Sequence, residues 1–152
     1  MANEIKGGGN HDLSTDKLSQ DLNVITAEIN AYQRVAGEAI FEIGRRLKHV
    51  KENDLAHGEW ASWCEGTVGI DRSTANKFIR VYDELEDVGT YPRLGLRALY
   101  EIATLPPEAR EVEHELPSGT TKKPEDMTVR ELRELKKALK QAEAERRERE
   151  RL

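Results

Sequence analysis

Residues 72–80 carry a group of side chains suited to contacting nucleic acid. All of them donate hydrogen bonds through guanidinium, ammonium, amide or hydroxyl groups, and they are Arg72, Ser73, Thr74, Asn76, Lys77 and Arg80. On a helix, charged donors contact phosphates, and a bidentate amide such as that of Asn76 reads an adenine edge. Ser73 and Thr74, near the helix start, would bring hydroxyls and backbone N–H groups to a phosphate. The segment therefore predicts a recognition helix for double-stranded DNA.

A helix-turn-helix over residues 57–86 is predicted to hold these donors outward. Trp60, Trp63 and Cys64 lie at helical spacing, and Gly66 and Gly69 then interrupt the pattern with the backbone freedom of a turn. A second helix follows, capped by Asp71 or Ser73. Its buried side repeats at three and four residues, through Ala75, Phe78, Ile79, Tyr82 and Leu85. A plain three-helix core without a ligand is the alternative that the same pattern allows.

A long helix is expected before this motif, from about residue 22 to residue 50. Its apolar residues step by three and four, and they are Ile25, Ile29, Tyr32, Ala36, Ile40, Ile43, Leu47 and Val50. A basic run near its end supplies candidate phosphate contacts, which are Arg45, Arg46, Lys48 and Lys51. Cations in the last turn of a helix also complement the helix dipole, so the run has a second explanation.

The fold class predicted from these patterns is all-α, a small helical bundle followed by a linker and an extended C-terminal helix. Residues 1–18 are expected to form a disordered tail, residues 19–115 the helical core, and residues 116–127 the linker. Thr128 and Glu131 form a capping box that opens a charged helix over residues 128–152. Its short apolar seam predicts a coiled coil for oligomerisation through Leu132, Leu135 and Leu139.

Residues for catalysis or metal binding are not grouped in the sequence. The four histidines and Cys64 offer no pair at the close spacing of metal ligands, and no phosphate-binding loop or nucleophile motif occurs. Cys64 falls inside an apolar stripe, which indicates a buried structural thiol. We therefore predict a protein that is not an enzyme and that binds neither a metal nor a cofactor.

The overall charge limits how the chain could bind DNA. Its 152 residues carry 24 Lys and Arg against 29 Asp and Glu, a formal net charge of -5. Because non-specific affinity for nucleic acid comes from a basic surface, a local basic face presented by a homodimer is required. A single cysteine and the lack of a long apolar run predict a cytoplasmic protein without a membrane partner.

Three motifs between Ala36 and Tyr82 resemble a known family. They are Glu42-Ile43-Gly44-Arg45-Arg46-Leu47, His57-Gly58-Glu59-Trp60 and Gly69-Ile70-Asp71-Arg72-Ser73-Thr74-Ala75. They are similar to a domain of unknown function in phage and mobile-element proteins of Gram-positive bacteria. This resemblance implies a helix-turn-helix-like core and a bacterial or phage origin. The second half also resembles plasmid partition and replication proteins, which read DNA through such a helix.

Two functions are compatible with the sequence. The first is sequence-specific DNA binding by a dimer from a prophage or mobile element, in transcriptional regulation, replication or segregation. The second is a protein-interaction module, such as an antirepressor or an inhibitor of a host protein, with a host or phage protein as partner. The second gains if Asp71, Asp83 and Glu84 neutralise the face around Lys77 and Arg80.

Overall fold

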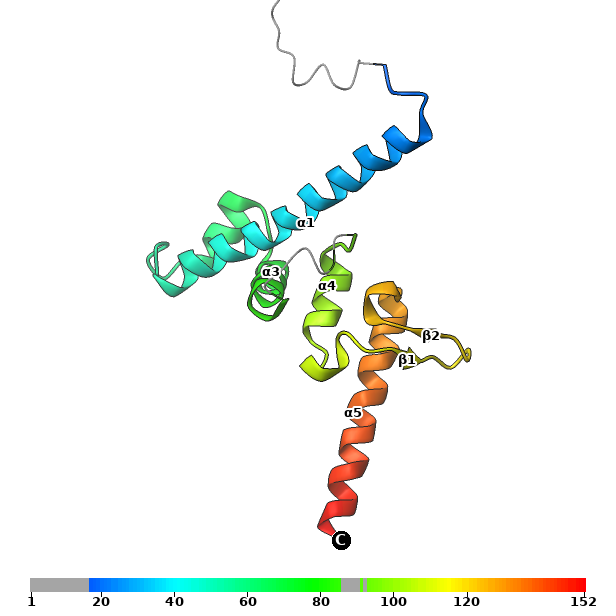
Figure 1. Ribbon diagram of the computed structural model, residues 1–152. Helices are drawn as coiled ribbons and strands as arrows, with labels where there is room; N and C mark the ends of the chain where they lie inside the picture. The colour runs from blue at the N-terminus through cyan, green and yellow to red at the C-terminus, as the bar shows by residue number, and fades with distance from the viewer. Residues whose placement is uncertain (1–16, 86–90, 92) are drawn as a thin grey trace, which may run out of the picture. The chain divides into compact units, whose positions relative to one another are not determined.

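The computed structural model describes residues 17–85, 91 and 93–152. Its helices are α1 (Leu22–Glu52), α2 (Trp60–Ser62), the π-helix η2 (Trp63–Val68), α3 (Arg72–Leu85), α4 (Leu96–Ala103), the 3-10 turns η4 (Pro107–Ala109) and η5 (Pro124–Asp126), and α5 (Val129–Arg151). The predicted all-α class, with a long first helix and a C-terminal helix, is confirmed (Figure 1). The predicted N-terminal tail lies almost wholly outside the described residues.

The chain divides inside α1 into two units, residues 1–32 and 33–152. In the described part of the first unit, Leu22–Tyr32 are the opening turns of α1. The second unit holds the rest of α1 and all later elements. Its buried side chains form two clusters, one around the helix-turn-helix and one around α4 and α5.

The first cluster joins the C-terminal part of α1 to the helix-turn-helix. Leu47, Cys64 and Ala75 are buried at its centre, and both tryptophans pack around them. Gly44 lies where α1 crosses α3, and a Cβ placed there would be 2.3 Å from the Phe78 carbonyl oxygen. The two helices approach this closely only because residue 44 has no side chain.

The turn between the two helices of the motif differs from the predicted one. Only Trp60–Ser62 is α-helical, and Trp63–Val68 continue as a π-helix that includes Gly66. The Cys64 carbonyl accepts hydrogen bonds from the N–H groups of Gly69 and Ile70, at 2.7 and 2.9 Å. Gly69 has φ 87°, so the left-handed turn residue is Gly69 alone.

The segment 116–127, expected to be a linker, is part of the folded core. Strands β1 (His114–Glu115) and β2 (Thr121–Lys122) pair antiparallel, with His114 opposite Lys122. Leu116, Pro124 and Met127 are buried around this hairpin. The proline, threonine and glycine residues of this segment therefore belong to a tight hairpin. No linker separates the helical core from the C-terminal helix in residues 116–127.

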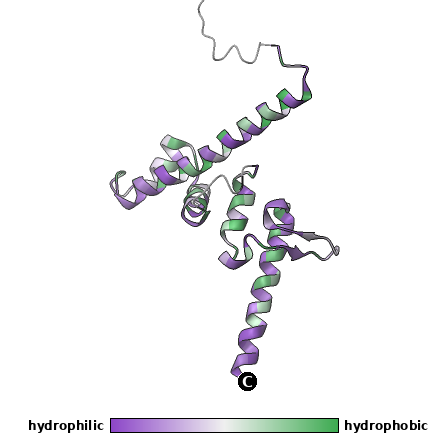
Figure 2. Ribbon diagram, in the orientation of Figure 1, coloured by the Kyte–Doolittle hydropathy of each residue, from purple (hydrophilic) through white to green (hydrophobic). Residues whose placement is uncertain are grey.

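The leucines predicted for oligomerisation are used within the chain instead. Leu132 is fully buried, Leu135 is 9% exposed, and Leu139 packs at the edge of the same cluster. The capping box holds the start of α5 in place, because the Thr128 hydroxyl accepts from the Glu131 N–H at 3.1 Å. Figure 2 shows the apolar residues of α5 in its first half and hydrophilic ones toward its end. The predicted seam between copies is therefore wrong for Leu132 and Leu135.

Candidate nucleic-acid interface

Five of the six predicted donors line one open hollow on α3. They are Arg72, Ser73, Asn76, Lys77 and Arg80, which we call the α3 face. The hollow has a volume of about 700 Å³ and is also bordered by Tyr100 of α4. The apolar side of the same helix packs inward through Ala75 and Val81, which are buried. The arrangement is an amphipathic helix that presents hydrogen-bond donors to solvent.

Thr74 is the predicted donor that the structure assigns to another role. Its N–H and its hydroxyl both donate to the Asp71 carboxylate, at 2.8 and 3.2 Å. These hydrogen bonds hold the pKa of Asp71 below its ordinary value. An ionised carboxylate therefore caps α3 where a phosphate was expected. The N–H and the hydroxyl of Thr74 are thus both engaged by Asp71, while Ser73 is exposed.

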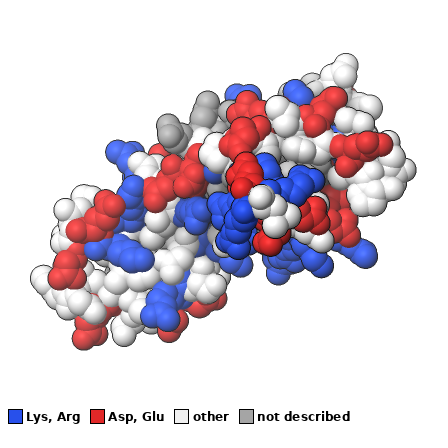
Figure 3. Space-filling model, turned by 90° about the horizontal axis from the view of Figure 1, so that it is seen from below, with Lys and Arg blue, Asp and Glu red and all other residues white. Residues whose placement is uncertain are grey.

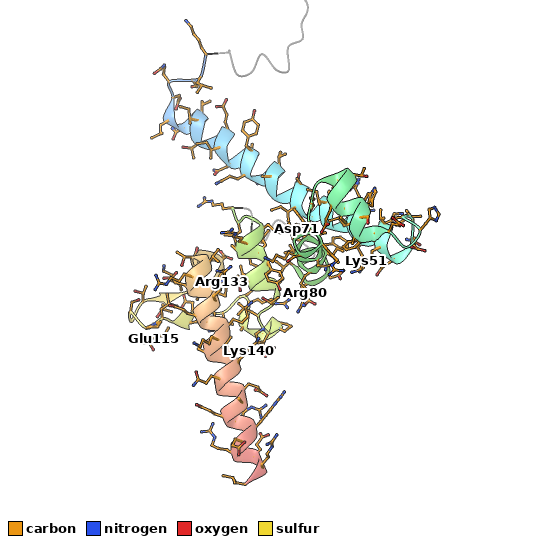
Figure 4. The ribbon with its side chains drawn as sticks, turned by 180° about the vertical axis from the view of Figure 1, so that it is seen from behind. Lys51, Asp71, Arg80, Glu115, Arg133 and Lys140 are labelled. Carbon is orange, nitrogen blue, oxygen red and sulfur yellow. The ribbon has the colours of Figure 1, made fainter. Side chains whose placement is uncertain are left out.

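Of the basic run in α1, only Lys51 reaches the α3 face. Its ammonium donates to Asn76 Oδ1 at 3.3 Å and lies 4.6 Å from the centre of the Trp60 ring. Lys51 is labelled in Figure 4. Lys48 instead binds Asp83 at 2.5 Å, a hydrogen bond that raises the pKa of Lys48. Arg45 and Arg46 pair with Glu42 within α1. They line a separate hollow with Lys48.

Two carboxylates near the α3 face, Asp83 and Glu84, are engaged by cations outside it, whereas Glu65 and Asp71 border the same hollow and pair with no cation among the described residues. Asp83 binds Lys48, and Glu84 binds Arg110 at 2.9 Å and Arg80 at the longer distance of 3.7 Å. Across residues 17–85, 91 and 93–152, neither Arg72 nor Lys77 forms an ion pair with a carboxylate. The condition that would have favoured a protein partner, neutralisation of the α3 face by carboxylates, is thus met in part: Glu84 pairs with Arg80, and the charge of Asp71 lies near Lys77.

A second basic surface on α5 adjoins the α3 face. It consists of Arg133, Lys136, Lys137 and Lys140, which we call the α5 strip, and it borders a hollow of about 380 Å³. The ammonium of Lys77 lies 5.4 Å from the centre of the Tyr100 ring, and that of Lys136 lies 5.5 Å from it. Tyr100 therefore joins the two surfaces. Figure 3, which views the molecule from below, shows Lys and Arg interspersed with Asp and Glu over the visible face.

The α5 strip is partly neutralised by one buried carboxylate. Glu101 pairs with Lys136 at 2.6 Å and with Arg133 at 3.2 Å. Burial by itself raises the pKa of Glu101, but the hydrogen bonds and charges of the two cations outweigh it and the pKa is lowered. Lys137 and Lys140 are exposed, and they form no ion pair within the described residues. They are the positive groups that α5 offers to a ligand.

The α5 strip was not assigned to the site from the sequence. Its signal is Lys136-Lys137 followed by Lys140, a spacing that puts the three side chains near one another on a helix. The same spacing is common on solvated helices. Only the packing of α5 against α4, which brings Lys136 to Tyr100, connects it with α3.

The comparisons with known proteins support the resemblance to a domain of unknown function. Residues 20–93 match the model of a family described as protein of unknown function DUF3102. The match spans α1, α2, η2 and α3 and ends before α4. Neither the curated proteins nor the solved structures gave a match. In the part of the chain that the structure describes, none of the helices has the length and apolar character to cross a membrane.

Proposed function

We propose that the protein binds double-stranded DNA sequence-specifically by placing α3 in the major groove. The observation that carries this proposal is the junction of the α3 face with the α5 strip at Tyr100. There, Arg72 and Lys77 are left without ion pairs among the described residues, and Asp83 is bound by Lys48 outside the face. A surface of this kind attracts phosphates, and Asn76, whose amide oxygen accepts from Lys51 at 3.3 Å, offers its amide N–H groups to a base.

Each part of the surface has a role in this proposal. Asn76 and Arg72 project from the first half of α3, the part of a recognition helix that meets base edges. Lys77 and the exposed Lys137 and Lys140 contact phosphates on either side. The acidic remainder of the chain keeps non-specific binding weak, so that specific contacts dominate. We place this activity in the cytoplasm, in regulation, replication or segregation of a prophage or mobile element, with a homodimer as the binding species.

The proposal predicts that Lys77→Ala combined with Arg80→Ala abolishes a specific mobility shift. The two cations lie on the α3 face, and their loss should weaken binding by roughly 2 to 4 kcal/mol, about thirty-fold or more. The DNA would be the promoter and origin regions of the element that encodes the chain, at about 150 mM salt. The slope of binding against salt should fall by about one for each phosphate that the variant no longer neutralises.

The matched control removes two positive charges elsewhere. Lys123→Ala with Arg130→Ala changes the net charge equally, and both residues are exposed near the start of α5. This variant should shift DNA almost as the wild type does. Both double variants should keep the wild-type melting temperature, since the altered side chains are at most half-buried. Equal loss of the shift in both would show that only net charge matters, and the α3 face would then lose its assignment.

A protein partner is the second candidate, and one observation favours it. The hollow on α3 is lined by three carboxylates, Glu65, Asp71 and Asp83, as well as by three cations. A surface with both signs of charge is complementary to another protein surface of mixed charge. Glu65→Gln discriminates the two functions, because it removes a charge that repels phosphate. If α3 binds DNA, this variant binds DNA more tightly; weaker or unchanged binding would favour the protein partner.

A further inference from the structure

The opening turns of α1 expose a row of large apolar side chains. Leu22 is 75% exposed, Ile29 53% and Tyr32 66%, with Ile25 half-buried between them. Leu18, which lies just before the helix, is 76% exposed. These five residues follow one another at spacings of four, three, four and three. We call them the α1 seam.

The α1 seam is the beginning of a stripe whose later part is buried. Farther along the same helix, Ile40 packs against one core cluster, and Ile43 and Leu47 belong to the other. The later residues of the stripe therefore pack against the core of the second unit. Within the described residues nothing covers its first turns. A contiguous apolar patch of this kind on a surface indicates an interaction site.

We propose that the α1 seam pairs with the same seam of a second copy in a parallel two-stranded coiled coil. An apolar repeat that averages 3.5 residues keeps its side chains facing another helix with the same repeat. A globular partner would not require apolar residues that alternate at spacings of three and four. Leu132 and Leu135 of α5 are buried in the core, whereas the side chains of the α1 seam are largely exposed and available for self-association.

The residues flanking the seam favour the parallel arrangement. Within α1, Glu28 lies along one edge, and the other edge carries the uncharged Thr26 and Gln33. In a parallel pair each acidic edge faces the uncharged edge of the partner. In the antiparallel pair that aligns Ile25 with Ile29, the two Glu28 side chains would lie side by side and repel. Pairing of two like seams in parallel therefore avoids the unfavourable contact.

This inference does not depend on DNA binding, so it is tested without DNA. Sedimentation equilibrium of the full chain up to about 100 µM should show a dimer, a range that detects micromolar association. Leu22→Glu with Ile29→Glu should give a monomer, because charges cannot be buried in the seam. Asn23→Glu with Asn30→Glu adds the same charge on the opposite side of the helix and should stay dimeric. Circular dichroism should show the second unit folded in all three proteins.

One added cysteine tests whether the two α1 helices run parallel or antiparallel. Leu22→Cys should form a covalent dimer on oxidation, because equivalent seam positions face each other in a parallel pair. Cys64 is fully buried and gives little background. A dimer without this cross-link would overturn the parallel arrangement, and a dimer that survives Leu22→Glu with Ile29→Glu would overturn the seam itself. A wild-type monomer at about 100 µM would exclude a second copy and leave residues 1–16 or another protein as the occupant.

Discussion

Gly44→Ala should destabilise the protein by about 2 to 3 kcal/mol, because the added methyl group has no space between α1 and α3. Its Cβ would lie 2.3 Å from the Phe78 carbonyl oxygen and 2.9 Å from the Tyr82 Cβ. The first of these neighbours is backbone, which cannot rotate away, so the two helices must separate. Alanine is worth about 1 kcal/mol more than glycine in a helix interior, but this gain is smaller than the overpacking cost.

Gly66→Ala is the matched control for this substitution. Gly66 lies inside the π-helix η2, and no atom outside its immediate neighbours is within 4 Å of the position a Cβ would take. This variant should be as stable as the wild type or slightly more stable. Urea unfolding monitored by circular dichroism measures the unfolding free energy of each variant. A Gly44→Ala protein of wild-type stability would show that α1 and α3 do not cross at this distance.

The helices could be predicted because each is marked by local features of the sequence. Periodic apolar residues predicted α1 and α3, and the cap predicted at Asp71 or Ser73 lies at the beginning of α3, where the structure has Asp71 as the cap. The π-helix could not be predicted in this way, since Trp60, Trp63 and Cys64 suit either helix. It depends on the two hydrogen bonds that the Cys64 carbonyl accepts beyond the helix.

For the apolar seams of α5 and α1, the spacing of apolar residues did not identify what packs against them. Leu132 and Leu135 have the spacing of a coiled coil, yet they pack against α4 in the same chain. Leu22 and Ile29 have the same spacing and are exposed. The apolar repeat predicts that one side of a helix packs against another element, but it does not identify that element. That information comes from packing between residues far apart in the sequence.

Only the part of the candidate site that lies on α3 could be predicted from the sequence. Five donors of α3 are neighbours whatever the rest of the fold does, so their face followed from the sequence. The contribution of α5 did not, because Lys77 and Lys136 meet at Tyr100 only through tertiary packing. The role of Thr74 within the fold is also local: the capping carboxylate of Asp71, three residues before it, accepts hydrogen bonds from the Thr74 N–H and hydroxyl.

Glu101→Gln should destabilise the protein by about 2 kcal/mol at neutral pH. The side chain of Glu101 is 7% exposed, and it pairs with Lys136 and Arg133. Loss of one partner of a buried ion pair costs about 3 to 5 kcal/mol, and the exposure of Arg133 to water lowers this figure. Glu134→Gln is the control, because Glu134 pairs with Arg130 at 3.8 Å on the surface, and its stability should be nearly that of the wild type.

The pH dependence separates the charge of Glu101 from its packing. Its pKa in the folded protein is below the ordinary value of 4.5, since Lys136 and Arg133 favour the ionised form. The stabilisation is therefore complete above pH 4.5 and is lost as the pH falls through the lower folded pKa. The difference in unfolding free energy between wild type and Glu101→Gln should be largest near pH 7 and should shrink below pH 4.5. A difference that stays constant across this range would mean that Glu101 contributes by shape alone, and that α5 is held against α4 by Leu132 and Leu135 without the ion pairs.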